Sequence, residues 1–536
     1  MDTPVAASPE TETPTSRSPW LVLTVLCLGF FMILLDTTIV NIAVPDLTTD
    51  LDANLDQVLW IVNAYTLVYA GLLITGGRLG DLYGQKRLFM IGLVVFTLAS
   101  AACGLAQSPG QLVATRALQG IGGALLTPQT LAIITITFPP ERRGSAYGIW
   151  GAVAGIATLA GPTLGGALVT AWGWRWIFYV NLPIGIVTLV LALRILPDLR
   201  FNRKVRLDWL GTVLGSAGLF LICFGLIEGP PLAWSPWILA AIAGGVGLVG
   251  LFLWQQYANR ERDPLIPLGV FADRNFAVMN GVVAAISFGM LGLFLPLVIF
   301  LQSVLNLTAL QAGLVLAPMS LASVAMAPVA GRIADRYGGK DILIIGLVLW
   351  AFGVGLVLYS ARLYYDRSEI ITGLVVAGIG LGMTFAPLQS IAMRRVQPRM
   401  AGAAAGLINT SRQIGAVIGS AAVGAVLQAQ LAYRLPISAR ENAIALPQSF
   451  RNRFIEGFEK AASAKGLQVG TGQTGARLPA DIPSSVRPGV LQVAEKTFYE
   501  AYIPTMRVTL ILPLVVLALA ALAVFLVKRP TDQEQT

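Results

Sequence analysis

The sequence predicts an all-α polytopic membrane protein made of two related halves, and three observations lead to this fold class. The chain has 536 residues, of which 55% are hydrophobic and only 12% are charged, and its mean hydropathy is +0.72. A soluble domain carries about 25% charged residues, so this chain has too few to cover a surface exposed to water. Apolar runs long enough to cross a bilayer recur along its length, and one ten-residue motif occurs twice.

Fourteen apolar runs predict fourteen transmembrane helices, because a membrane-crossing helix needs about 20 mostly apolar residues. The tail at 1–19 is rich in Pro, Ser, Thr and Glu and lacks the basic start of a signal peptide. We expect this tail to be disordered and cytoplasmic. The fourteen runs lie near 21–44, 57–77, 88–106, 111–136, 145–170, 175–195, 208–228, 235–256, 275–300, 308–330, 341–360, 369–390, 401–429 and 505–527.

Lys and Arg in the connecting segments predict the orientation, because cytoplasmic loops carry an excess of these residues. With the N-terminus in the cytoplasm, the basic clusters between the runs fall on the cytoplasmic side. The short outer loops then hold three bases, Arg175, Arg362 and Arg367. Both termini are therefore predicted to be cytoplasmic. The net charge of +9 follows from this topology, which argues against a nucleic-acid partner.

The decapeptide GRLGDLYGQK at 77–86 returns as GRIADRYGGK at 331–340, which is 254 residues further on. The same offset carries the first apolar run onto the ninth and the fourth onto the twelfth, which predicts two six-helix bundles in parallel repeat. Such repeats are typical of secondary transporters, with the substrate path between the halves. The predicted organisation is a tail at 1–19, a first bundle at 20–200, two extra helices with a linker at 201–272, a second bundle at 273–530 with an outer insert lacking any span at 430–504, and a tail at 531–536.

The repeated motif is interpreted as a gate at the cytoplasmic face. Glycine allows the tight turns between helices, and an acid held near helix N-termini and bases can latch one face and release it. An ordinary basic loop would explain Lys86 and Arg87, but not the recurrence of Gly, Asp, Gly and Lys at the same spacing. The predicted gating residues are Gly77, Asp81, Gly84, Lys86 and Arg87 in the first copy, and Gly331, Asp335, Gly338 and Lys340 in the second.

Asp36 lies inside the first apolar run and is predicted to bind and release a proton. An ionised carboxylate near the middle of a bilayer costs about 2.5–3.5 kcal/mol on insertion scales, and burial favours the protonated form of a carboxyl group. The alternative is a structural acid that accepts hydrogen bonds from Thr37, Thr38 or Asn41. The equivalent position in the second half is Met290, so proton binding is expected in the first half.

Two bases also lie inside apolar runs. Arg116, in the fourth run, is followed by Gln119. A lone guanidinium in lipid is very unfavourable, so Arg116 is expected to face a wet cavity or to pair with Asp36, in a contact that is either fixed or mobile. Arg412, in the thirteenth run, has no evident acid near it.

The fifth apolar run contains the string GPTLGG, which holds Gly161, Pro162, Gly165 and Gly166. Glycine lets helices approach closely, and proline allows a bend. Plain small-residue packing explains each glycine taken alone, whereas the joined string favours a dedicated bending point.

The residues that the sequence lacks exclude several chemistries. The chain has no histidine, so it offers no His metal ligand and no His general base. Cys27, Cys103 and Cys223 lie within apolar runs and are interpreted as small buried hydrophobic residues. The string YGGKD at 337–341 lacks the glycine spacing and the Ser or Thr of a phosphate-binding P-loop. We therefore expect no enzyme activity, metal or cofactor, and transport driven by an ion gradient.

These motifs resemble those of the major facilitator superfamily, in particular the fourteen-helix drug:proton antiporters of the EmrB/QacA type, over nearly all of residues 20–530. Leu82 and Gln85 stand where the family usually has arginines, which weakens the expected gate unless Arg87 compensates. The string WRWIFYVNLPIG at 174–185 resembles the start of the group's sixth helix. The other motifs match at Leu35, Asp36, Thr38, Val40, Asn41, Ala43 and Pro45 in the first helix, at Gly77, Leu79, Asp81, Gly84 and Lys86 in the loop, at Arg116, Gln119 and Gly120 in the fourth helix, and at Gly161, Pro162, Gly165 and Gly166 in the antiporter motif.

The resemblance implies a major facilitator fold of two six-helix bundles plus two extra central helices, in the cytoplasmic (inner) membrane of a bacterium. It implies proton-coupled export of lipophilic or amphiphilic drugs by alternating access, with the small-molecule substrate, protons and membrane lipid as partners of a monomer. Helices nine, ten and thirteen carry no acid in their cores, so neutral or monovalent substrates are expected. The alternative is export of a specific endogenous metabolite, siderophore or lipid. Candidate substrate-binding residues, each of which could equally be an interhelical hydrogen-bonding group, are Asn63, Tyr65, Gln119, Gln389 and Asn409.

Overall fold

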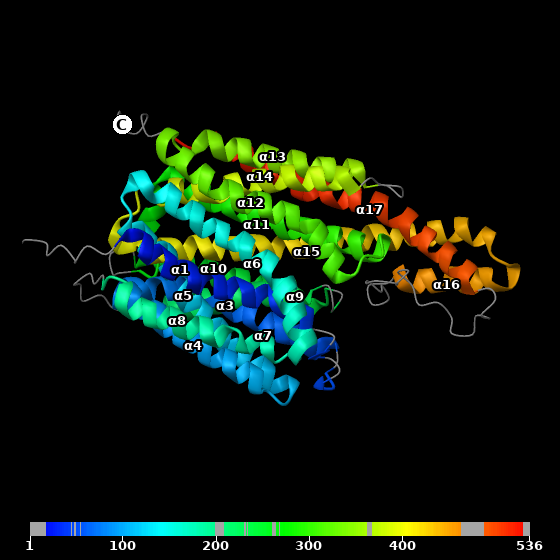
Figure 1. Ribbon diagram of the computed structural model, residues 1–536, viewed down its shortest axis with the longest axis horizontal. Helices are drawn as coiled ribbons and strands as arrows, with labels where there is room; N and C mark the ends of the chain where they lie inside the picture. The colour runs from blue at the N-terminus through cyan, green and yellow to red at the C-terminus, as the bar shows by residue number, and fades with distance from the viewer. Residues whose placement is uncertain are drawn as a thin grey trace, which may run out of the picture.

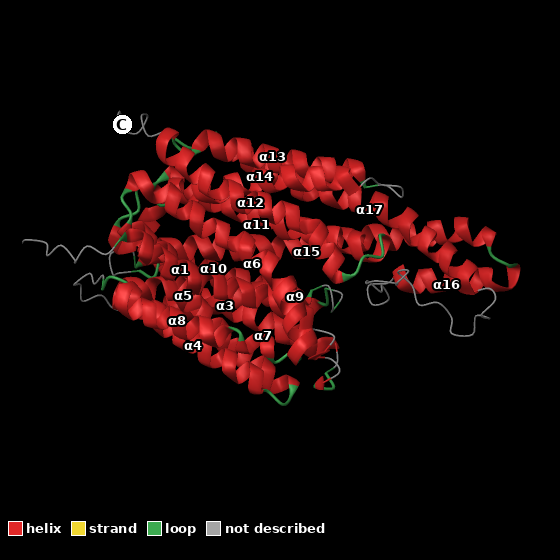
Figure 2. Ribbon diagram, viewed as in Figure 1, coloured by secondary structure: helices red, strands yellow, loops and turns green. Residues whose placement is uncertain are grey.

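The structure is a computed structural model in which the described residues are helical, without a strand (Figure 2). Fourteen of these helices are long and apolar enough to cross a membrane, which confirms the predicted all-α, multi-pass fold class. The tails predicted at 1–19 and 531–536 lie almost wholly outside the described part of the chain. The structure describes residues 18–43, 46–47, 50–53, 55–198, 208–229, 232, 234–259, 264–266, 268–361, 367–462 and 487–528.

Figure 1 shows the helices running roughly side by side, with the first half in blue and cyan and the second in green to red. The first half comprises α1 (Pro19–Ile39), α3 (Leu55–Tyr83), α4 (Gln85–Leu105), α5 (Pro109–Thr137), α6 (Arg143–Trp172), α7 (Trp176–Tyr179) and α8 (Asn181–Ile195). The two extra helices are α9 (Trp209–Glu228) and α10 (Pro236–Ala258). The second half comprises α11 (Arg274–Ile299), α12 (Ala309–Tyr337), α13 (Lys340–Ser360), α14 (Arg367–Ala392), α15 (Ala401–Asn442), α16 (Gln448–Ala462) and α17 (Arg487–Val524).

Short helical turns join several of these helices. A π-helical turn, η4 (Phe300–Val304), extends α11. The 3₁₀ turns are η1 (Val40–Ala43), η2 (Pro140–Arg142), η3 (Leu268–Ala272), η5 (Pro398–Met400) and η6 (Ala443–Ala445).

The internal repeat is visible in the helix bounds. Helix α12 begins and ends 254 residues after α3, the offset that separates the two copies of the decapeptide. Each of these helices ends at a glycine with positive φ, +96° at Gly84 and +85° at Gly338. That conformation strains any residue with a side chain, so both glycines are required where the chain turns into the next helix.

The most extensive contacts between the two halves are two helix pairs that the repeat relates to each other. Helix α6 of the first half packs against α12 of the second, and α15 of the second packs against α3 of the first. The extra helices α9 and α10 pack against each other, and α9 also contacts α3 and α15. The extra pair therefore lies beside the seam and leaves both inter-half contacts intact.

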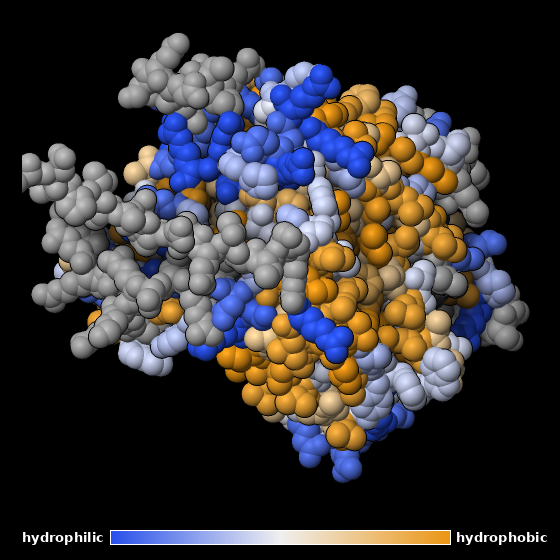
Figure 3. Space-filling model, turned by 60° about the vertical axis from the view of Figure 1, so that its left-hand side comes forward, coloured by the Kyte–Doolittle hydropathy of each residue, from blue (hydrophilic) through white to orange (hydrophobic). Residues whose placement is uncertain are grey.

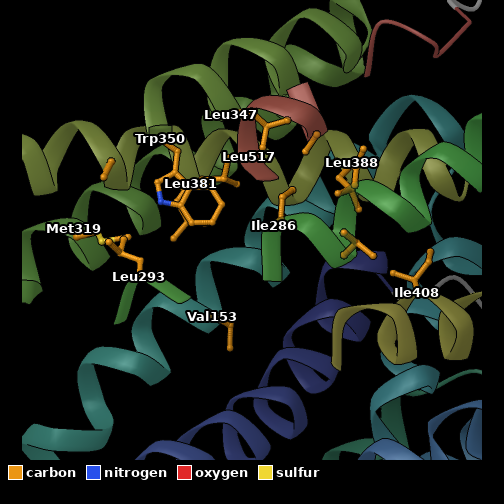
Figure 4. Close-up of a cluster of buried hydrophobic side chains, with 14 of the residues drawn as sticks. Val153, Ile286, Leu293, Met319, Leu347, Trp350, Leu381, Leu388, Ile408 and Leu517 are labelled. Atoms are coloured by element: carbon orange, nitrogen blue, oxygen red, sulfur yellow. The ribbon is translucent and has the colours of Figure 1, made fainter. Parts of the chain in front are cut away.

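Buried apolar side chains fill the second half and reach the first (Figure 4). In lipid the hydrophobic effect does not drive helix association, so close packing and small residues do. Figure 3 shows a broad hydrophobic surface with hydrophilic side chains toward its ends, as expected for helices facing lipid. The labelled members of the cluster are Val153, Ile286, Leu293, Met319, Leu347, Trp350, Leu381, Leu388, Ile408 and Leu517.

The predicted outer insert at 430–504 contains more helix than its sequence suggested. Helix α15 continues to Asn442, α16 follows, and α17 begins at Arg487, so the three helices form the projection at the right of Figure 1. Phe454, Phe458 and Phe498 are buried within it. A search for wholly apolar runs misses such helices because they keep polar faces. Residues 463–486 of the insert lie outside the described part of the chain.

Candidate functional site

Asp36 lies on α1 in a fully buried polar network (0% exposed). Its Oδ2 accepts a hydrogen bond from Arg116 Nη1 of α5 at 2.5 Å. Its Oδ1 accepts from Gln119 Nε2 at 2.8 Å and from Asn181 Nδ2 of α8 at 3.2 Å. The carboxylate is therefore held by three donors from two helices, all within the first half.

Arg116, which is 1% exposed, is fixed on several sides. Its Nη1 also donates to Gln119 Oε1 at 2.7 Å, and its Nε donates to the Ile61 carbonyl at 3.3 Å. The guanidinium carbon lies 4.5 Å from the centroid of the Tyr65 ring, a cation–π contact. This environment compensates the buried charge and sets the direction in which the guanidinium meets Asp36.

Sequence reasoning missed the contributions of Ser100 and Asn181. Asn181 Nδ2 also donates to Ser100 Oγ at 3.1 Å, and Ser100 Oγ donates to the Phe178 carbonyl at 2.9 Å. Asn181 belongs to the recognised string at 174–185. The available signal was an amide at the start of the sixth span, where a buried polar side chain needs a partner.

The threonines that follow Asp36 have other partners in the structure. Thr37 Oγ1 donates to the Ile33 carbonyl at 3.0 Å, and Thr38 Oγ1 donates to the Leu35 carbonyl at 3.0 Å. The side chain of Asn41, and Pro45 of the same motif, lie outside the described residues. The side-chain donors to Asp36 are therefore Arg116, Gln119 and Asn181, and the choice between a proton-binding and a structural acid stays open to experiment.

A cavity of about 430 Å³ opens between the halves beside this network. Its lining is mostly apolar and comes from α1, α6, α11, η4 and α12. The α12 residues in the lining lie at 312–320, near the end of that helix opposite the repeated decapeptide. Its volume lies within the range of about 300–1,000 Å³ typical of small-molecule sites. Polar members of the lining are Thr37, Thr38, Thr163, Gln302 and Ser320.

The glycine string of α6 permits its close approach to α1. A Cβ added at Gly161 would lie 2.1 Å from Thr38 Oγ1, and one at Gly165 would lie 2.7 Å from Ile39 Cγ1. A Cβ at Gly166 would meet no atom within 4 Å. Pro162 lies inside α6, and its side chain is outside the described residues. Two of the three predicted glycines therefore act through contact with α1, next to Asp36.

The first copy of the decapeptide joins the two halves. Asp81, at the end of α3, accepts hydrogen bonds from the backbone N–H groups of Gly402 at 2.8 Å and Ala403 at 2.7 Å, at the N-terminus of α15. A carboxylate there satisfies free amide donors and interacts favourably with the helix dipole. A Cβ at Gly77 would lie 2.3 Å from the Gly402 carbonyl oxygen, so the latch requires a glycine at that position.

The second copy makes the reciprocal contact. Asp335, at the end of α12, accepts from the N–H groups of Gly144 at 2.6 Å and Ser145 at 2.8 Å, at the N-terminus of α6. A Cβ at Gly331 would lie 2.3 Å from the Gly144 carbonyl oxygen. We call these two contacts the paired latch. It holds the two halves together on the face that carries both decapeptides.

The lysines of both copies also have matching roles. Lys86 Nζ donates to the Leu196 carbonyl at 2.7 Å, after the end of α8. Lys340 Nζ donates to the Val527 carbonyl at 2.7 Å, after the end of α17. Each cation thus interacts with the free carbonyls at a helix C-terminus.

Gln85, one of the two residues that depart from the loop motif, contacts the acid of the first latch. Gln85 Nε2 donates to Asp81 Oδ1 at 3.2 Å, and Arg78 exerts a favourable charge effect on Asp81. Arg87 is exposed. Gln85 therefore supports Asp81 directly, whereas the compensation expected of Arg87 stays a prediction.

The predicted substrate residues do not line the cavity between the halves. Gln119 belongs to the Asp36 network, and Tyr65 packs against Arg116. Asn409 Nδ2 donates to the Ala405 carbonyl at 2.8 Å, and its Oδ1 accepts from Arg412. Gln389 is buried with neither amide atom bonded, and Asn63 is half-buried on α3. The structure thus groups two of the five with the Asp36 network and one with Arg412.

Comparison with known proteins agrees with the fold. The family pattern described as Major Facilitator Superfamily matches residues 26–420. The chain is 42% identical over 420 residues to the "Uncharacterized MFS-type transporter Rv1250" of Mycobacterium tuberculosis, covering 78% of this chain and 72% of that protein. It is 35% identical over 423 residues to the "Multidrug resistance protein Stp" of the same species, covering 78% of each.

A solved structure shares the architecture. The human organic anion transporter MFSD10 (TETRAN) superposes with a TM-score of 0.58 at 14% identity, over 94% of this chain and 100% of that one. At this identity the likeness concerns the fold. The family pattern spans most of the chain and agrees with its two latched six-helix halves, so the chain belongs to the major facilitator superfamily.

Proposed function

We propose that this chain is a proton-coupled antiporter that exports lipophilic or amphiphilic compounds by alternating access. It would act in the cytoplasmic membrane of a bacterium, with both termini in the cytoplasm. The observation that carries the proposal is the buried Asp36, held by donors and placed next to a cavity between the halves. An ionisable residue within the membrane is costly, so its presence by default indicates a functional site.

Proton binding at Asp36 would change the network in a defined way. In this conformer both carboxylate oxygens accept hydrogen bonds, and Arg116 donates to Oδ2 at 2.5 Å. Protonation would remove the negative charge and weaken the bond to the guanidinium. The buried cation would then lack its counter-charge, which favours rearrangement of α1 and α5.

The position of α1 supports coupling between the proton and the cavity. Thr37 and Thr38, which follow Asp36, line the cavity, and Gly161 of α6 packs against Thr38. A shift of α1 would therefore change the cavity wall and the α6 contact together. Each proton entering the cell gains about 2.3 kcal/mol per 100 mV of membrane potential, which is the energy available for export.

The paired latch supports the other part of the cycle. Asp81 and Asp335 bind helix N-termini across the seam, so this conformer is held closed on the decapeptide face while the cavity lies toward the opposite one. Release of both latches would open the decapeptide face. The apolar lining suits a lipophilic cargo, and a transporter whose relative is named for multidrug resistance is expected to lower the cytoplasmic drug concentration.

The test uses the full chain in vesicles with an imposed pH gradient and a panel of lipophilic dyes that includes neutral and acidic members. We expect Asp36→Asn to abolish uphill, gradient-driven export while leaving downhill dye exchange in place, because the neutral amide cannot carry the proton. Glu456→Gln, on the exposed surface of α16, is the matched control and should export normally. Uphill export by Asp36→Asn at the wild-type rate would remove Asp36 from the coupling role.

A further inference from the structure

Arg412 on α15 is a second cation within the membrane-spanning part of the protein. Its guanidinium donates to the side-chain oxygen of Asn409 on the same helix, and its central carbon lies 5.5 Å from the centroid of the Trp150 ring on α6. Among the described residues, no carboxylate lies within ion-pair distance of it. Arg116 by contrast has Asp36. Arg412 therefore carries a charge for which the described chain supplies no counter-charge.

Trp150 adds a second donor that lacks an acceptor. Its side chain is 1% exposed, and its indole Nε1 has no hydrogen-bond partner. An indole N–H can only donate, so a buried one without an acceptor is unfavourable. The Trp150 N–H and the Arg412 guanidinium lie in one contact. A hydrogen-bond acceptor with a negative charge would satisfy both groups.

The contact lies at the seam between the halves, outside the residues that line the cavity of this conformer. Helices α6 and α15 belong to different halves, and each packs against a helix of the other half, α12 and α3 respectively, rather than against the other. The Arg412 and Trp150 side chains therefore meet across the seam. Phe30 of α1 stacks on Trp150 with ring centroids 4.0 Å apart and an interplanar angle of 16°. The two donors therefore lie beside a stacked and buried aromatic pair.

We propose that Arg412 and Trp150 form a subsite for an acidic group on the exported compound, with the Trp150–Phe30 stack receiving its flat apolar part. This rests on the proposed export function and narrows its substrate class from lipophilic compounds in general to amphiphilic acids. A carboxylate would accept hydrogen bonds from the guanidinium and the indole N–H and would neutralise the charge of the half-buried Arg412. Tyr69 of α3 is the titratable group within electrostatic range of Arg412, and its hydroxyl donates to Thr127 at 3.3 Å.

The competing role is structural: the Arg412–Trp150 contact would simply hold the two halves together. The two roles predict different dependence on the charge of the ligand. A structural clamp would change the affinity for acidic and neutral ligands equally. An acid-binding subsite would change the affinity for the acid and leave that for a neutral analogue of the same shape.

The test measures thermal stabilisation of the purified full chain in detergent by pyrenebutyrate and by the neutral pyrenebutanol. A ligand that binds only the folded state stabilises it by RT ln(1 + [L]/Kd), so a series of ligand concentrations gives the Kd of each variant from the rise in unfolding temperature. We expect Arg412→Gln to weaken pyrenebutyrate binding at least about tenfold and pyrenebutanol binding by less than about twofold. Arg412→Lys keeps the charge and should retain part of the preference for the acid. Partition of each ligand into detergent cancels because the same ligand is compared between variants.

Trp150→Phe provides an independent variant, because it removes the indole N–H and keeps an aromatic ring beside Phe30. We expect it to weaken pyrenebutyrate binding about threefold or more and to leave pyrenebutanol binding unchanged. Equal losses for the two ligands in both variants, or no preference of the wild type for the acid, would overturn the proposal. The readout requires no gradient, so a failure of Asp36-dependent export would be seen separately.

Discussion

The two halves of this transporter share one scaffold and differ in their buried charges. In the first half, Arg116 is paired with Asp36 and enclosed by Gln119, Tyr65 and Ile61. In the second half, Arg412 donates to Asn409 and lies near Trp150, without an acid among the described residues. Under the two proposals made above, the first half would bind the proton and the second half would recognise the ligand.

The internal repeat shows that the two halves share their helices and latches and differ at single charged side chains. Asp81 binds the residues at 402–403 and Asp335 binds those at 144–145, so α15 and α6 correspond at a spacing of 258 residues (402 − 144). At that spacing the counterpart of Arg412 is Ala154. The helices and latches are duplicated, whereas the intramembrane charges are not. Asymmetry therefore arises from single side chains on a symmetric frame.

The largest expected effect is on stability and sharpens the comparison of the two arginines. Arg116→Met leaves Asp36 buried without its counter-charge, which should cost about 3–5 kcal/mol. Arg412→Met removes an unpaired cation and should cost less than about 1 kcal/mol. Thermal unfolding in detergent measures both variants. Equal destabilisation by the two substitutions would break the comparison.

The second prediction concerns the paired latch, which both halves contribute to. Asp81→Asn and Asp335→Asn each remove charge-assisted bonds to a helix N-terminus, which should weaken closure of the decapeptide face by about 1.5–3 kcal/mol per latch. The measurement is thiol labelling at Ala327→Cys, a buried position on α12 where Gly148 of α6 packs. Both variants should increase labelling to a similar degree, and the exposed Glu141→Gln should not. Increased labelling in one variant alone would show that the latches are not equivalent.

The smallest expected effect concerns close helix approach in each half. Gly161 and Gly419 are separated by the same 258 residues (419 − 161), and a Cβ at Gly419 would lie 2.6 Å from the Phe288 carbonyl oxygen of α11. Alanine at either position should destabilise the protein by about 1–3 kcal/mol through overpacking. Gly166→Ala is the matched control, since its Cβ meets no atom within 4 Å. A loss of stability in Gly166→Ala as large as in Gly161→Ala would contradict this account of the glycine string.

Much of the scaffold could be predicted from the sequence because the bilayer imposes simple rules. Apolar runs of sufficient length identify transmembrane helices, and the repeated decapeptide reveals the duplication. Asp36 and Arg116 were singled out because charges inside apolar runs are costly. Asn181 was not, because a neutral amide in a helix gives no comparable signal. The helices of the outer projection were missed because their polar faces interrupt the apolar pattern.

The sequence by itself determined the number of spans, the duplication and the identities of the rare intramembrane charges, because each leaves a mark in composition or spacing. Only the tertiary structure decided what those charges and acids meet. Asp81 binds backbone N–H groups at 402–403. Every residue except proline has a backbone N–H group, so the sequence does not show which of them an acid will bind. Likewise, Arg116 finds its acid while Arg412 meets an indole across the seam, because contact between distant helices depends on how whole bundles pack.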